Sequence, residues 1–290
     1  MRLHCLGTAG FHPNANRHTS CYFLPEAGVL LDAGTGVFRL PHLIQTDTID
    51  LLLSHAHLDH VCGLTFLLDV FYQRPIEKLR IWGEAAKLNA IRTHLFSDLI
   101  FPVELDAEWI AIDDLENFQA GGANVTWRLQ DHPGGSVGYR LVWEKKGEGV
   151  TATKKGKSLV YLTDTTGDAS AEGVEWCGKP DLMMHECYFD DSMEDWARMT
   201  GHSWTSRVAE IAAAAMPKKL LVTHINPLIG EPVVKNRPTV EPTGESTSSE
   251  KAQPTARPSL PADFATQCEL IQQQTRAEVI LAEDGLVVDF

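Results

Sequence analysis

Four residues that can bind a metal ion lie close together near the start of the chain: His55, His57, Asp59 and His60. They follow an apolar run at residues 50–53, which is typical of a buried strand, and a helical pattern begins directly after them. Because His55 and His57 are two positions apart, an extended segment can turn both imidazoles to the same side. Imidazole nitrogens and carboxylate oxygens are Zn²⁺ ligands, so the pattern predicts a zinc site. The alternative interpretation is a polar turn rich in histidine.

Three further residues of the same types each follow a strand-like run. They are His132, Asp164 and His224. Each would be weak evidence alone, because a single histidine after a strand is more often structural. The carboxyl ends of strands are, however, where sites on open sheets collect. We therefore expect these three residues to join the first four.

The intervening sequence predicts the elements that must position these residues. Apolar runs predict strands at 2–6, 29–32, 50–53, 79–82, 125–129, 137–143, 159–163, 182–185, 220–223, 279–281 and 286–290. Apolar periodicity predicts helices at 61–71, 84–96, 205–216 and 264–275. The first half of the chain is rich in predicted strands, and helices lie between the strands later in the sequence. This order of elements favours an α/β fold of two packed sheets with helices outside.

Length and composition narrow the class of protein. The 290 residues, 43% of them hydrophobic, suit one layered domain over residues 1–290. Residues 230–263 are rich in proline, serine and threonine, so we expect them to form a loop insert. No apolar run is long enough to span a membrane or to act as a signal peptide, which favours a cytoplasmic protein. The six cysteines are scattered and do not indicate disulfides.

The net charge of −14 weighs mildly against a large nucleic-acid substrate, because such a chain repels polyanions at long range.

The motif at residues 51–60 resembles that of the metallo-β-lactamase superfamily, and within it the ribonuclease Z-like branch. The segments at 6–10 (LGTAG), 30–36 (LLDAGTG), 132–139 (HPGGSVGY), 162–165 (LTDT), 221–224 (LVTH) and 282–285 (AEDG) are similar to further motifs of the branch. The similarity covers almost the whole chain. It implies a four-layer αβ/βα sandwich.

The resemblance also implies two Zn²⁺ ions, with Mn²⁺ or Fe²⁺ as alternatives. By the family pattern, one metal is held by His55, His57 and His132, and the other by Asp59, His60 and His224. Asp164 would bridge the two metals, and Asp32, His4 and backbone carbonyls are candidates to orient the ligands. The implied reaction is phosphodiester hydrolysis by a metal-bridging hydroxide, as in an endonuclease, with Asp59 also a candidate base.

Two later segments resemble loops that meet at the site in this branch: 185–187 (HEC) and 201–203 (GHS). They make His202 a candidate general acid or phosphate contact, with Glu186 orienting it. The alternative is that His202 only belongs to a helix cap, with Ser203 or Thr205 as the capping residue. A role for His185 is left open.

The sequence departs from tRNA-processing members in lacking a long basic arm. Residues 133–163 leave room only for a hairpin with lysines near its tip. The first hypothesis is a phosphodiesterase acting on a small molecule or an RNA end, and it rests on Asp59 among the ligands and on the loops of Glu186 and His202. The second is a hydrolase of carboxylic esters, lactones, thioesters or β-lactams, and the third is a non-catalytic metal-binding protein. A homodimer is implied by the resemblance alone.

Overall fold

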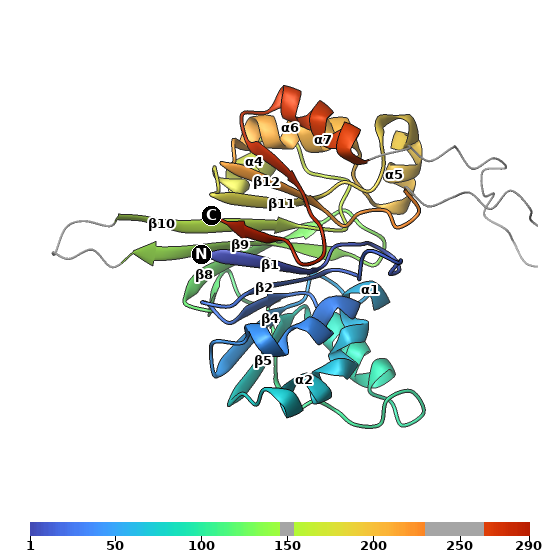
Figure 1. Ribbon diagram of the computed structural model, residues 1–290, viewed down its shortest axis with the longest axis vertical. Helices are drawn as coiled ribbons and strands as arrows, with labels where there is room; N and C mark the ends of the chain where they lie inside the picture. The colour runs from blue at the N-terminus through green and yellow to red at the C-terminus, as the bar shows by residue number, and fades with distance from the viewer. Residues whose placement is uncertain (146–153, 230–263) are drawn as a thin grey trace, which may run out of the picture.

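A computed structural model describes residues 1–145, 154–229 and 264–290 (Figure 1). The predicted insert at 230–263 and the tip of the predicted hairpin lie outside these residues. The prediction of one domain with a loop insert therefore stays a prediction. In the described part of the chain, no helix is long and apolar enough to cross a bilayer.

Two seven-stranded mixed sheets form the centre of the molecule. The first sheet has the order β14 (Val287–Asp289), β1 (Arg2–Gly7), β2 (Cys21–Leu24), β3 (Val29–Leu31), β4 (Thr48–Leu52), β5 (Lys78–Gly83) and β6 (Glu108–Ala111). The second has the order β13 (Glu278–Leu281), β12 (Lys219–Thr223), β11 (Leu182–Glu186), β10 (Lys154–Leu162), β9 (Ser136–Lys145), β8 (Ala123–Gln130) and β7 (Phe118–Ala120). The terminal strands β1 and β14 pair antiparallel, so both ends of the chain lie in the first sheet.

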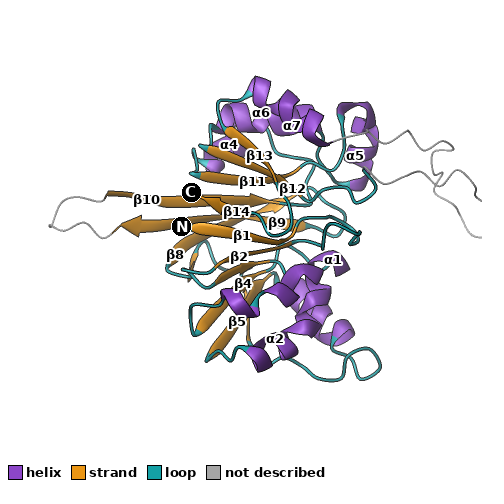
Figure 2. Ribbon diagram, viewed as in Figure 1, coloured by secondary structure: helices purple, strands orange, loops and turns teal. Residues whose placement is uncertain are grey.

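Helices cover the outer face of each sheet (Figure 2). The first half supplies α1 (Leu58–Val61), α2 (Leu67–Gln73) and α3 (Ala85–Ala90), with short 3-10 turns at Thr35–Arg39, Pro41–Leu43 and Cys62–Phe66 and a π-turn at Ile91–Leu95. The second half supplies α4 (Ala171–Cys177), α5 (Glu194–Thr200), α6 (Thr205–Ala215) and α7 (Phe264–Gln274), with a 3-10 turn at Asp191–Met193. This arrangement confirms the predicted four-layer sandwich.

Three apolar clusters hold the layers together. The central one contains residues of both sheets, among them Tyr22 of β2 and Leu141 of β9, each fully buried. The other two fill the spaces between each sheet and its own helices. Strand β3 is buried along its whole length, so its sequence is continuously apolar rather than alternating.

The structure corrects several predicted boundaries. The predicted helix at 61–71 is broken into α1, a 3-10 turn and α2, because Gly63 packs against the backbone of Gly34, where an added Cβ would lie 2.2 Å from the Gly34 oxygen. Strands β2, β6 and β7 and helices α4 and α5 were not predicted, since they are short and carry no clear periodicity. The predicted hairpin is confirmed as the antiparallel pair β9 and β10.

Truncating Leu141 to alanine should lower the free energy of unfolding by about 2–5 kcal/mol, because it opens a cavity between the sheets. Urea unfolding measures this loss. The matched control is Leu129→Ala, whose side chain is 62% exposed and should change stability by less than about 0.5 kcal/mol. Equal losses for the two variants would contradict this account of the core.

Candidate metal centre

The seven predicted ligands converge at one end of the two sheets. In the first sheet, His55 and His57 follow β4, and α1 carries Asp59 and His60. In the second sheet, the ligands follow parallel-running strands: His132 comes after β8, Asp164 after β10 and His224 after β12. Side chains from both halves of the sequence therefore meet at the carboxyl ends of the strands, as the sequence predicted.

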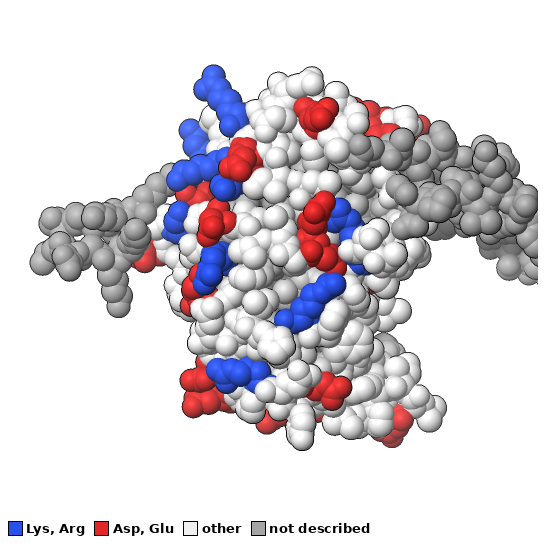
Figure 3. All heavy atoms as spheres, in the orientation of Figure 1, with Lys and Arg blue, Asp and Glu red and all other residues white. Residues whose placement is uncertain are grey.

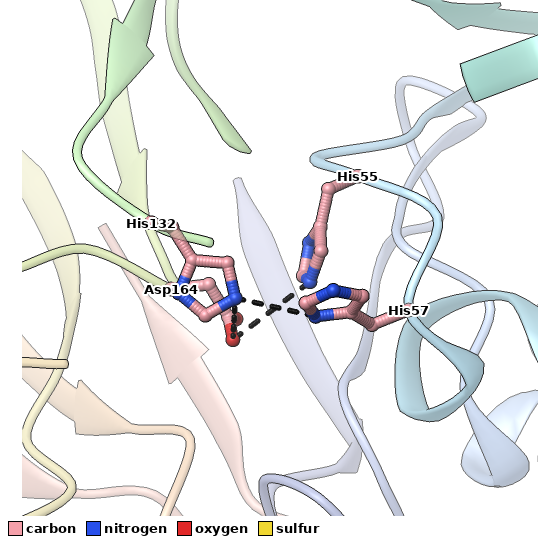
Figure 4. A group of neighbouring side chains, drawn as sticks. All are labelled: His55, His57, His132 and Asp164. Atoms are coloured by element: carbon pink, nitrogen blue, oxygen red, sulfur yellow. Dashed lines mark hydrogen bonds and ion pairs between the residues drawn. The ribbon is translucent and has the colours of Figure 1, made fainter. Parts of the chain in front are cut away.

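One group consists of His55, His57, His132 and Asp164 (Figure 4). His57 Nδ1 and His132 Nε2 lie 3.2 Å apart. Asp164 Oδ1 lies 3.6 Å from His132 Nε2 and 3.8 Å from His55 Nε2. His55 Nε2 is buried and has no hydrogen-bond partner among the described residues. A buried nitrogen without a partner is costly, and a cation bound there would satisfy it.

The second group consists of His60 Nε2, His224 Nε2, Asp59 Oδ2 and Asp164 Oδ2. Five distances between these atoms lie between 3.0 and 3.4 Å. A tetrahedral zinc with bonds of 2.0–2.1 Å has ligand atoms about 3.3 Å apart, so these atoms are spaced as such a site requires.

Asp164 belongs to both groups through different oxygens. Its Oδ1 faces His55 and His132, and its Oδ2 lies 3.0 Å from His60 Nε2 and 3.2 Å from His224 Nε2. The carboxylate is fully buried, and Thr163 Oγ1 donates to Oδ2 at 2.7 Å. This arrangement fits a carboxylate that is shared by two cations.

A hydrogen-bond network behind the ligands fixes their orientation. Asp32 Oδ2 accepts from His60 Nδ1 at 2.7 Å and from Tyr161 Oη at 2.6 Å. Both carboxylate oxygens of Asp32 also accept from Ser54, one from the backbone N–H and one from the hydroxyl. His60 Nε2 is therefore free to face the second group, and the predicted orienting role of Asp32 is consistent with this geometry.

Three residues of the site hold left-handed backbone conformations. Asp32 has φ 55°, Asp164 has φ 49° and His224 has φ 51°. Each such residue costs on the order of 1–3 kcal/mol and persists only where the surroundings enforce it. The strain at Asp164 and His224 turns both side chains inward at the ends of their strands.

The charges of the site are arranged for a cation. Burial lowers the pKa of His55, His57 and His132, which favours the neutral imidazoles that ligate metals. Burial alone would also lower the pKa of His60, but the carboxylates of Asp59, Asp164 and Asp32 raise it well above its usual value. The same carboxylates would attract a bound metal ion.

His202 and Glu186 lie beside the second group. Glu186, at the end of β11, is fully buried and accepts from Thr165 N at 2.6 Å and from His202 Nδ1 at 3.1 Å. Burial alone would lower the pKa of His202, but the Glu186 carboxylate raises it to about 9. The His202 ring also stacks on Tyr188, with centroids 4.6 Å apart. Because Nδ1 is bonded to Glu186 and His202 lines the cleft, its other ring nitrogen, Nε2, can donate a proton in the cleft.

The capping interpretation of this segment is wrong. Helix α6 has Trp204 as its N-cap with no side-chain cap bond, and Ser203 Oγ instead donates to Thr165 O at 2.7 Å. His185 is fully buried, its Nδ1 donates to Glu186 O, and it is absent from the described residues that line the cleft. His185 therefore does not lie on the described wall of the cleft, and a role for it stays open.

A cleft of about 770 Å³ opens above the metal-binding groups. Besides His57, Asp59, His132, Asp164, His202 and His224, its lining consists of Phe11, Leu58, Pro133, Tyr188, Phe189, Met199 and Thr200. No lysine or arginine is among the described residues that line it. Sequence reasoning missed the apolar members, because a few aromatic and aliphatic residues in loops and short helices carry no pattern that marks them as part of a site.

Comparison with known proteins agrees with this geometry. Residues 28–225 match the family described as the Beta-lactamase superfamily domain, so the chain belongs to that family. Ribonuclease Z of Archaeoglobus fulgidus is 26% identical over 78% of this chain and 87% of its own length.

Two solved structures share the fold. The metallo-beta-lactamase fold protein YhfI from Bacillus subtilis has a TM-score of 0.69 at 18% identity, covering 99% of this chain and 98% of its own. The short form of human tRNase Z has a TM-score of 0.66 at 21% identity, and the match covers 100% of this chain and 98% of that structure's chain. The comparisons confirm the predicted superfamily and fold, and they support the predicted class of enzyme, a metal-dependent hydrolase.

Replacing Asp32 by asparagine should weaken zinc binding by roughly 10- to 100-fold, because the His60 ring loses the carboxylate that orients it. Asparagine tolerates the left-handed backbone at this position, so the fold should persist. Competition with a chromogenic chelator measures the affinity. Asp50→Asn is the matched control, since Asp50 is a buried aspartate of the same sheet that bonds Trp82 rather than a ligand. Unchanged zinc affinity in the Asp32 variant would contradict the orienting role.

Proposed function

We propose that the protein is a dinuclear zinc phosphodiesterase whose ligands are the seven residues described above. The observation that carries the proposal is the double contact of Asp164, whose two oxygens face two separate groups of histidines. His55, His57 and His132 would hold one zinc, and Asp59, His60 and His224 would hold the other. When bound, the two ions would lower the pKa of a water molecule and polarise a phosphoryl oxygen.

Asp59 was predicted both as a ligand and as a candidate base. Asp59 suits a ligand better than a base: although burial opposes the charge, neighbouring His60 and His224 hold its pKa far below its usual value. Asp59 also accepts a hydrogen bond of 2.7 Å from Phe11 N, which fixes its carboxylate. Its predicted role as a base stays a prediction.

His202 is the proposed general acid. Its Nδ1 is held by Glu186, whose carboxylate raises the pKa of the ring and favours its protonated form. Proton donation from Nε2 to the leaving oxygen would then follow from its place on the cleft wall. A leaving alcohol needs this proton, whereas a good leaving group such as p-nitrophenolate does not.

The cleft favours a small phosphodiester over a long RNA. Its described lining has no lysine or arginine to neutralise neighbouring phosphates. Among the described residues on the face drawn in Figure 3, acidic and basic side chains are interspersed and form no continuous basic field. Processing of RNA ends, the homodimer and the cytoplasmic location remain predictions.

The proposed class of substrate can be tested with a panel of three compounds. Zinc-loaded protein should hydrolyse bis-p-nitrophenyl phosphate and leave an acyl lactone and a chromogenic cephalosporin unchanged. Turnover of the lactone or cephalosporin alone would replace the proposal with a carboxylic hydrolase, which the apolar lining of the cleft would suit. No turnover at full metal occupancy would favour a non-catalytic metal-binding protein.

The acid role predicts a selective defect in His202→Ala. The zinc content should be unchanged, while kcat for a phosphodiester with an alkyl leaving group should fall by about 100-fold or more. The loss should be much smaller for a p-nitrophenyl ester. His94→Ala, which removes an exposed histidine away from the cleft, is the control. Since His202 also lies near enough to Asp164 and His224 to ligate a metal, loss of zinc in His202→Ala would make it a ligand instead.

A further inference from the structure

The loop between β1 and β2 contacts two of the predicted metal ligands. Gly10 lies against His224, where an added Cβ would come within 2.3 Å of the imidazole ring. The next residue, Phe11, donates its backbone N–H to Asp59 Oδ2 at 2.7 Å. The position of this loop is therefore fixed relative to the second group of ligands.

The backbone at Phe11 is unusual for so bulky a residue. Its φ is 61°, in the left-handed region that phenylalanine rarely adopts, and its ring is 74% exposed. The strain turns the N–H toward Asp59, while the ring lies in the wall of the cleft. A strained residue with an exposed aromatic ring beside a catalytic centre points to a role in binding.

The rest of the loop is anchored firmly. Asp284, in the turn before β14, accepts from Thr8 Oγ1 at 2.8 Å and from His18 N at 2.7 Å. Asn14 Nδ2 donates to Pro227 O at 3.0 Å, which ties the loop to the segment after His224. The backbone at Phe11 is thus held in place before a ligand arrives, so little backbone entropy is lost on binding.

The other apolar residues of the cleft complete a surface for a flat group. Tyr188 and Phe189 belong to the same lining, as do the exposed side chains of Leu58 and Met199. The described lining offers no lysine or arginine for a second phosphate. The chemistry that fits is one phosphodiester at the metals with an apolar ring attached to it.

We propose that Phe11 determines specificity by stacking on a planar aromatic substituent of the substrate, which is a phosphodiester of low charge. This inference rests on the proposed phosphodiesterase function for the position of the phosphate. The metals would bind the phosphate of any phosphodiester, whereas Phe11 would distinguish substrates by their aromatic group. Stacking of one ring on an aromatic side chain contributes roughly five- to hundredfold in affinity.

The test compares two phosphinate monoanions that mimic the diester but have no ester bond to hydrolyse: methylphenylphosphinate, which carries a ring, and dimethylphosphinate, which does not. Calorimetric titration of zinc-loaded protein should show tighter binding of the phenyl compound, by roughly five- to hundredfold. Phe11→Ala should remove most of this preference, and Phe11→Tyr should keep it. Zinc content should be unchanged in both variants, because the contact to Asp59 comes from the backbone.

Tyr72→Ala is the matched control, since this aromatic residue is 88% exposed and is absent from the described cleft lining. The proposal is overturned if the wild type shows no preference for the phenyl compound or if Phe11→Ala retains the preference in full. The results distinguish failure of the proposed phosphodiesterase function from failure of the proposed role of Phe11. Ring-selective binding without hydrolysis of any phosphodiester would contradict only the phosphodiesterase, whereas hydrolysis without ring selectivity would contradict only the role of Phe11.

Discussion

The charge of one buried carboxylate, Asp164, sets the requirements for the whole site. A buried anion is unfavourable unless positive charge compensates it. In the described part of the chain, the His60 imidazole faces the carboxylates of Asp164, Asp59 and Asp32 together, so one protonated imidazole there cannot balance three negative charges. Two metal ions, one at each carboxylate oxygen, would provide the missing charge and would occupy the nitrogen of His55 that has no partner.

The two-sheet architecture is what brings such a cluster together. Four of the seven ligands follow a strand of the first sheet and three follow strands of the second, and the packed layer between the sheets fixes the distance between the two sets. Left-handed backbone at Asp32, Asp164 and His224 then aims individual side chains. The stability that these conformations cost is supplied by the core, as is common where a rigid scaffold carries a strained site.

The sequence predicted correctly those features that depend on residues close together in the chain. The spacing of His55, His57, Asp59 and His60 after a strand predicted their grouping, and the apolar runs predicted most central strands. It could not find Phe11 or Tyr188, because their role arises from a loop conformation and from tertiary contacts. It also misplaced the helix after His60, since the close packing of Gly63 on another loop leaves no signal in the periodicity.

The central claim is that Asp164 is shared by two bound zinc ions. Diffraction data collected on both sides of the zinc absorption edge, from crystals of active protein, test it most directly. The account predicts two anomalous peaks, one beside each oxygen of Asp164. One peak alone, or none in active material, would contradict it.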